Sequence, residues 1–174
     1  MKKLNKFCRI NALVLIIIGL FPLSAFAQND KEKAVIGKLL DDFNVAAANA
    51  EYEKYFNFYA DGAIFIGTDA TENWDKKAFM VWAKPFFDKK RTWNFKAIEC
   101  HIFLDKSGKF AWFDELLDTQ MKICRGSGVL TKHGKEWKLQ QYVLSMTIPN
   151  DKVDEVVKIK APIEEALMKK LSNK

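Results

Sequence analysis

Residues 109–148 read KFAWFDELLDTQMKICRGSGVLTKHGKEWKLQQYVLSMTI and decide the fold. Apolar and polar side chains alternate along most of this stretch, as they do in β-strands that bury one face. Short links at Lys122-Ile123 and His133-Gly134 divide it, and links of two residues join antiparallel neighbours. Together with the alternating residues before it, the stretch predicts a meander of four strands, over residues 93–104, 109–121, 125–132 and 136–148.

The chain before the meander has the period of helices. Asn29 and Glu32 have the spacing of a capping box, which marks a helix start. The pattern predicts, in order, a helix over about residues 30–49, a short helix over residues 52–59, a strand over residues 63–66, and a third helix that begins at Asp75 and is kinked or ended by Pro85.

Helices followed by a curled antiparallel sheet predict an α+β fold, a cone in which the curved sheet wraps on the N-terminal helices. The tail, residues 151–174, places Ile163, Leu167 and Leu171 four residues apart. It is expected to form an amphipathic helix, broken near Pro162, that packs on the domain or on a second subunit. The predicted organisation is therefore a signal peptide over residues 1–27, one domain over residues 28–150 and a helical tail.

The N-terminus has the pattern of a cleavable export signal. Four basic residues precede an apolar block, residues 10–23, and Ala25-Phe26-Ala27 supplies the small-x-small pattern of a cleavage site. The block is too short and too interrupted for a comfortable bilayer span of about 20 residues. We expect cleavage after Ala27, a periplasmic or secreted location, and no stable membrane anchor.

The charge of the chain argues against a nucleic-acid partner. The 28 Lys and Arg residues exceed the 22 Asp and Glu residues by six. Four of the basic residues lie in the predicted signal peptide, so the exported chain keeps an excess of only two. Its basic residues are also interleaved with acidic ones, which is typical of a solvated surface.

The region from about Tyr59 to Asn150 resembles the SnoaL-like branch of the nuclear transport factor 2-like superfamily, which also contains ketosteroid isomerase. The resemblance rests on the stretches Tyr59-Ala60-Asp61-Gly62-Ala63, Phe65-Ile66-Gly67-Thr68-Asp69, Lys84-Pro85-Phe86-Phe87, Ala111 to Asp118, Arg125 to Leu130 and Trp137 to Ser145. It implies a conical pocket lined by helices, and it implies Tyr55, Trp74 and Phe87 as pocket residues. It does not imply one activity, because the family includes both enzymes and binding modules. The aspartate and tyrosine set that ketosteroid isomerase uses has no residue-by-residue match here.

The two hairpin links also predict the register of the strands. They place Glu115 opposite Leu130, and Leu130 opposite Trp137, on the more apolar and therefore interior face. The other residues predicted to share this face include Phe113, Gln141 and Ser145. We take Phe113, Trp137, Gln141 and Ser145 as further ligand-binding candidates.

Glu115 is the anomaly of the predicted interior face, because an isolated buried charge is very costly. One interpretation is structural, with the carboxyl bonded to a backbone group or to the Trp137 indole. The other is functional, with Glu115 acting as a general acid/base of raised pKa or orienting a ligand. The sequence leaves both open.

The other reactive residues do not form a recognisable site. His101 and Cys100 are neighbours on an alternating strand and point to opposite faces, which argues against a zinc site with Cys124 and His133. We expect no metal, nucleotide or redox cofactor. The predicted register sets Cys100 and Cys124 about eight residues apart along neighbouring strands, so both are expected to be free thiols.

These observations favour an exported protein that binds a small apolar or amphipathic molecule. One alternative is a cofactor-free lyase, isomerase or hydrolase that uses Glu115. Another is a non-catalytic homodimer domain, because the predicted outer face of the sheet is unusually apolar. The residues expected on that face are Trp112, Leu116, Val129 and Tyr142.

Overall fold

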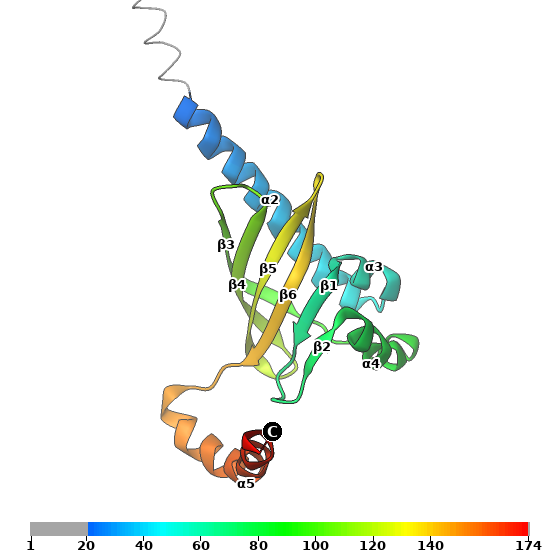
Figure 1. Cartoon of the computed structure of the whole chain (residues 1–174), viewed down its shortest axis with the longest axis vertical. Helices are drawn as coiled ribbons and strands as arrows, with labels where there is room; N and C mark the ends of the chain where they lie inside the picture. Colours follow the sequence, from blue (N-terminus) through cyan, green and yellow to red (C-terminus); the bar gives the residue numbers. More distant parts are fainter. Residues whose placement is uncertain (1–20, 174) are drawn as a thin grey trace, which may run out of the picture.

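The computed structural model describes residues 21–173, and the side chains from Gln28 onward (Figure 1). The first 20 residues of the predicted signal peptide lie outside the described residues. Within residues 21–173, none of the helices is both long enough and apolar enough to cross a membrane.

A six-stranded sheet with helices on its inner side confirms the predicted α+β class. The strands follow the order β2-β1-β6-β5-β4-β3, in which β1 runs parallel to β6 and every other pair is antiparallel. The sheet curves without closing. Its strands are β1 (Tyr59–Ile66), β2 (Asn73–Asp75), β3 (Lys96–Leu104), β4 (Phe110–Thr119), β5 (Lys122–His133) and β6 (Glu136–Met146).

The three helices before the meander form where the pattern predicts them, with different ends. They are α2 (Phe21–Ala48), α3 (Tyr52–Asn57) and α4 (Lys76–Asp88). The Asp75 carboxylate caps α4 by accepting the Ala78 amide at 2.8 Å, and α4 continues three residues beyond Pro85. The predicted capping box at Asn29 is wrong, because α2 starts eight residues earlier, at Phe21.

Helix α2 lies along the inner side of the sheet (Figure 1). It buries Ile36, Leu40 and Phe43, which recur at the helical spacing of three to four. In the first half of α2, the Glu32 carboxylate accepts hydrogen bonds from Lys132 Nζ at 2.7 Å and from Trp137 Nε1 at 2.8 Å. These bonds hold α2 against the β5–β6 hairpin.

The predicted hairpin register is wrong at both turns. The β4–β5 turn is Gln120-Met121, so Glu115 pairs with Gly126 and not with Leu130. The β5–β6 turn is Gly134-Lys135, in which Gly134 takes a positive φ of 64° that suits glycine. The shift between β4 and β5 is an even number of residues, so Glu115 still points inward.

A β-bulge in β6 reverses the inward face of that strand. Leu139 pairs with Leu130 and Gln141 with Val129, which leaves Gln140 as an extra residue. Before the bulge Trp137 and Leu139 are buried, as predicted; after it, Tyr142 and Leu144 are buried. The prediction that Gln141 and Ser145 point inward is therefore wrong, as is the placement of Tyr142 on the outer face.

The two cysteines of the described residues are free. Cys100 on β3 pairs with Glu115, and Cys124 on β5 pairs with Leu117, so both partners lie on β4 only two residues apart. The predicted separation of eight residues is wrong. Two strand spacings and two residues still leave roughly 12 Å between the cysteines, which exceeds disulfide reach.

The tail forms one helix, α5 (Val153–Ser172), after a short 3-10 turn, η1 (Asn150–Lys152). The predicted break at Pro162 is wrong, because the helix passes through this residue. No described residue of α5 is buried, and Ile159 and Ile163 are each 75% exposed. The apolar side of α5 therefore has no partner in the single chain.

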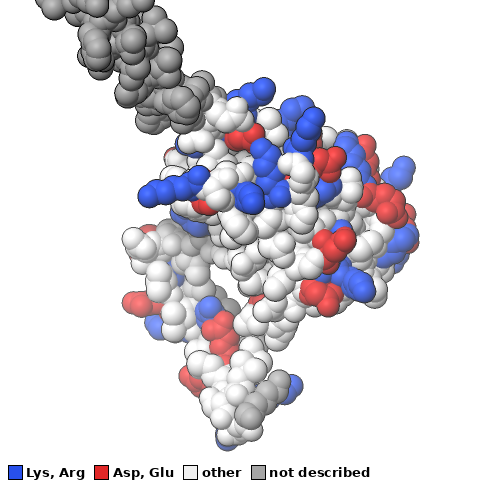
Figure 2. All heavy atoms as spheres, turned by 45° about the horizontal axis from the view of Figure 1, so that its top comes forward, with Lys and Arg blue, Asp and Glu red and all other residues white. Residues whose placement is uncertain are grey.

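Acidic and basic side chains are mixed over the face of the molecule that Figure 2 shows. No broad zone of one sign is visible on this face. Such mixing is typical of an ordinary solvated surface and not of a polyanion-binding groove.

Candidate functional site

An aromatic cavity of about 150 Å³ lies at the end of the sheet where β6 ends. The β1–β2 loop and the β4–β5 turn both contribute to its rim, through Gly67, Thr68, Glu72, Gln120 and Met121. Most of the remaining wall is aromatic. The aromatic lining residues are Phe43, Tyr55, Phe65, Phe79, Trp82, Trp93, Phe95 and Tyr142.

Each structural layer contributes to this wall. The inner side of α2 supplies Phe43, and α3 supplies Tyr55. In α4 the three-residue spacing places Phe79 and Trp82 on one side of the helix. The bulge at Gln140 then turns Tyr142 of β6 inward to complete the wall.

The rings of the wall have two main orientations. Phe65 and Phe79 stack with 9° between their planes, and Trp93 lies 20° from Phe79. Tyr55 is tilted by 69° from Phe79 and by 73° from Trp93. The aromatic lining therefore presents rings in two orientations that differ by about 70°.

Two of the aromatic lining residues, Tyr55 and Tyr142, carry hydroxyl groups. The Tyr55 hydroxyl lies 3.2 Å from that of Tyr59, and burial raises the pKa of both above the ordinary value. The Tyr142 hydroxyl donates to Glu115 Oε1 at 2.9 Å. Hydroxyls on apolar walls can fix the orientation of a ligand.

Glu115 lies behind Tyr142 and is only 1% exposed. Burial raises the pKa of its carboxyl from 4.5 to about 7; the hydrogen bond from Tyr142 opposes this rise, and the negative charge of Asp41 adds to it. Oε2 of Glu115 is buried and has no hydrogen-bond partner among the described residues. The carboxyl is therefore poised to change its charge near neutral pH.

Gly126 provides the space for the Glu115–Tyr142 pair. A Cβ at this position would lie 2.6 Å from both Glu115 Oε1 and the Tyr142 hydroxyl. No side chain larger than that of glycine fits there without moving the pair.

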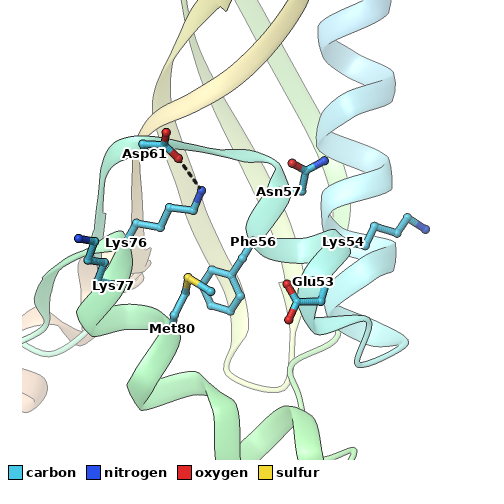
Figure 3. Close-up of a pocket in the computed structure, with 8 residues that line it drawn as sticks. All are labelled: Glu53, Lys54, Phe56, Asn57, Asp61, Lys76, Lys77 and Met80. Carbon is cyan, nitrogen blue, oxygen red and sulfur yellow. Dashed lines mark ion pairs between the residues drawn. The ribbon is translucent and has the colours of Figure 1, made fainter.

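A larger hollow, of about 880 Å³, lies on the surface between α3, the start of β1 and α4 (Figure 3). Lys76 points across it toward Asp61, at 3.5 Å, and also donates to the Tyr59 carbonyl at 2.9 Å. The hollow is open to solvent and its central lysine is already paired. We therefore place the candidate site in the smaller aromatic cavity.

The sequence of residues 36–149 matches the family model of the SnoaL-like domain. The chain belongs to this family. Among curated proteins, none matches the sequence. The resemblance predicted from the sequence is thus confirmed.

Solved structures share the fold of this SnoaL-like domain at low sequence identity. An NTF2-like family protein from Streptomyces avermitilis, described as a candidate dehydratase, is 12% identical with a TM-score of 0.60, over 70% of this chain and 99% of its own. An NTF2-like protein of unknown function from Pseudomonas putida is 13% identical with a TM-score of 0.58, over 71% and 92%. A cystatin-like domain of unknown function from Nostoc punctiforme is 12% identical with a TM-score of 0.58, over 81% and 94%.

The residues predicted as a site are spread over this SnoaL-like domain. Among the predicted ligand-binding residues, only Tyr55 lines the cavity. Trp74, Phe87 and Phe113 pack behind the wall against lining residues, at Phe79, Tyr55 and Tyr142 respectively. Trp137 binds Glu32 at the far hairpin, while Gln141 and Ser145 point away from the interior.

The interpretation of Glu115 also changes in detail. Its partner is Tyr142, and neither a backbone group nor the Trp137 indole, which donates to Glu32 instead. Sequence reasoning missed Tyr142 because a bulge has no fixed signature in a single sequence. The alternation of Trp93 and Phe95 before β3 was a usable signal for two other lining residues.

No group of three or more His, Cys, Asp or Glu residues that could hold a metal is found within the described part of the chain. His101 is a surface residue that bonds Asp114 and Glu99, each at 3.1 Å. The eight aromatic residues of the cavity lining suit apolar contact.

Proposed function

We propose that this protein is exported and binds a small, largely apolar molecule in its aromatic cavity. The observation that carries this proposal is the cavity wall of eight aromatic side chains, two of which, Tyr55 and Tyr142, have hydroxyl groups. Covering such a wall removes apolar surface from water, which stabilises a complex by roughly 25 cal/mol per Å². A few convergent polar groups on an apolar wall are typical of small-molecule sites.

The size of the cavity limits the ligand, or the part of it that enters. An apolar cavity of about 150 Å³ in another protein accepts a benzene molecule. The volume of about 150 Å³ found here therefore suits a group about as large as one six-membered ring. Larger ligands would extend past the rim at Glu72 and Gln120.

Tryptophan fluorescence tests binding, because Trp82 and Trp93 line the cavity. Toluene and para-cresol are expected to change the emission saturably and to raise the melting temperature. Trp82→Ala removes part of the wall and should weaken binding, whereas Val81→Ala, whose side chain is 77% exposed on α4, is the matched control. A folded protein that shows no saturable response to either compound would contradict the proposal.

The proposed export has its own test. The basic and apolar N-terminal pattern supports cleavage after Ala27, which would leave Gln28 as the first residue. Intact mass of the protein from its own cell envelope is expected to equal residues 28–174. Recovery of the uncleaved chain from the cytoplasmic fraction alone would contradict this. Native mass spectrometry of the same sample would also reveal a retained ligand.

A catalytic role has one specific observation in its favour, the pKa of about 7 at Glu115. Glu115 does not line the cavity, and its link to the cavity passes through the Tyr142 hydroxyl. In a lyase, isomerase or hydrolase, Tyr142 would contact the substrate and Glu115 would take or return the proton of its hydroxyl. Glu115→Gln would then lower turnover by roughly 10²–10⁴ with folding intact.

We also propose that two copies pair through the outer face of the sheet. Phe103 and Trp112 stack there at 5.6 Å and are 42% and 48% exposed, and Val129 pairs with Trp112 on the next strand. An apolar exposed face of this kind is typical of an interface. The double variant Trp112→Lys, Val129→Lys should sediment as a monomer, while Val81→Lys on α4 should not change the mass. A wild-type protein that sediments as a monomer would contradict the pairing.

A further inference from the structure

The charges around the aromatic cavity are of one sign. Among the described residues that line it, Glu72 is acidic and none is Lys or Arg. Glu115 adds a second carboxyl directly behind the Tyr142 ring. Lys76 does not line the cavity, and its ammonium group contacts the Tyr59 carbonyl and Asp61. Among the lining residues that the structure describes, no fixed positive charge offsets the two carboxyl groups.

The faces of the rings add to this negative potential. An aromatic ring carries partial negative charge on its faces, so a cation over the face is attracted to it. The rings of Tyr55 and Trp93 are inclined at 73° with 5.6 Å between their centroids, so the lining presents aromatic rings in more than one orientation. Sites that recognise quaternary ammonium groups use several rings in this way.

The Glu115–Tyr142 hydrogen bond strengthens the effect. A phenol that donates to a carboxylate gains electron density on its oxygen and ring. Oε2 of Glu115 is buried and has no partner among the described residues, so its negative charge is poorly compensated inside the protein. At the rim, Glu72 Oε2 accepts a long hydrogen bond, 3.2 Å, from the Asp69 amide.

From this arrangement we propose that the group bound in the cavity is a compact organic cation, an alkylated ammonium such as a trimethylammonium head. The inference rests on the proposed small-molecule function and narrows its ligand class. A trimethylammonium group is about as large as the single ring that a cavity of about 150 Å³ accepts. Its methyl groups are apolar enough for the aromatic wall, and its charge suits the ring faces. A carboxylate or phosphate group would instead meet two like-charged carboxyl groups and no Lys or Arg of the described lining.

The experiment compares choline with its neutral carbon isostere, in which a tert-butyl group replaces the trimethylammonium group. The two molecules have the same shape, so a difference in affinity reports the charge alone. Isothermal titration at pH 8, where Glu115 is largely ionised, should show choline binding roughly 3- to 30-fold more tightly than the isostere. Equal affinity, or tighter binding of the isostere, overturns the cation inference.

The double variant Glu72→Gln, Glu115→Gln tests the source of the preference. This variant should lose a large part of the choline advantage, which is the ratio of the affinity for choline to the affinity for the carbon isostere. It should bind the isostere itself as tightly as the wild type does. Glu136→Gln, on the exposed end of β6, is the matched control and should keep the full advantage. A choline advantage unchanged in the double variant overturns the role given to the two carboxyl groups.

Toluene separates failure of this inference from failure of the proposed function. If toluene binds and choline does not, the cavity is an apolar site and the cation inference alone is wrong. If toluene, choline and the isostere all fail to bind the folded protein, the proposed function itself is wrong. If the double substitution disrupts the fold, the single variants Glu115→Gln and Glu72→Gln are measured instead. Each of them should lower the choline advantage.

Discussion

Replacing Glu115 with Gln should change how the stability of the protein depends on pH. The folded-state pKa of Glu115 is about 7, against 4.5 for the free side chain, because of burial. Since the folded protein holds this proton more tightly, it binds more protons than the unfolded chain between these two values. The contribution of Glu115 to stability is therefore full below pH 4.5 and is lost as the pH rises through 7.

The size of this loss follows from the two pKa values. One pH unit corresponds to about 1.4 kcal/mol, so the raised pKa amounts to a loss of about 3 kcal/mol of unfolding free energy. Glu115 is 1% exposed, so solvent screening does not reduce this figure much. Burial also raises the pKa of Tyr142 and of Cys100, the latter to about 11, so both stay protonated in this range. The other acid whose charge affects the pKa of Glu115 is Asp41.

Urea unfolding at pH 4.5, 6 and 8 measures the effect, with the fold checked by circular dichroism. Glu115→Gln cannot titrate, so relative to the wild type it should gain about 3 kcal/mol between the lowest and the highest pH. Asp118→Asn, an exposed carboxyl on the same strand, is the matched control and should follow the wild type. Parallel stability curves for wild type and Glu115→Gln would refute the assignment of a raised pKa to this residue.

Three further predictions follow from particular contacts. Gly126→Ala should destabilise the protein by about 1–3 kcal/mol in urea unfolding, because the new Cβ would lie 2.6 Å from Glu115 Oε1 and the Tyr142 hydroxyl; a Ser127→Ala control that loses as much would argue against this cause. Glu32→Gln should lower the unfolding free energy by about 1 kcal/mol at pH 7, because the hydrogen bond from Lys132 lowers the pKa of Glu32 in the folded protein. The contribution of Glu32 to stability is therefore present above pH 4.5 and is lost as the pH falls below 4.5. A loss in the variant that persists undiminished at low pH would contradict the charge argument. Cys100 should react slowly with iodoacetamide in the native protein, and Cys124, which is 0% exposed, only after unfolding; an exported chain two daltons below its reduced mass would instead show a disulfide.

Much of the fold could be predicted from the sequence because it depends on local periodicity. Alternation between residues 109 and 148 determines the strands of the meander, and helical spacing determines α2, α3 and α4. Glu115 points inward because side-chain direction depends only on the parity of its strand, which a register error of an even number of residues preserves. The same parity places Trp112 on the outer face.

The aromatic cavity could not be predicted in the same way, because its residues come from distant parts of the chain. Trp93 and Tyr142, for example, share a wall although 49 positions separate them in the sequence. The packing of α4 against the end of β6 decides which aromatic residues line the cavity and which fill the core. Trp74 and Phe87 are aromatic residues of the same types as Trp82 and Phe79, but they lie behind the cavity wall.

The sequence by itself determined the strand order of the meander, the helical segments and the inward direction of Glu115. Only the tertiary structure decided that Tyr142, and not Gln141, faces this carboxyl. The reason is the extra residue at Gln140, which reverses every later side chain of β6. A bulge forms where cross-strand packing favours it: with Gly126 leaving room, Tyr142 satisfies a buried carboxyl and fills the aromatic wall at once. That advantage depends on β4, β5 and β6 packing together, and no local pattern along β6 encodes it.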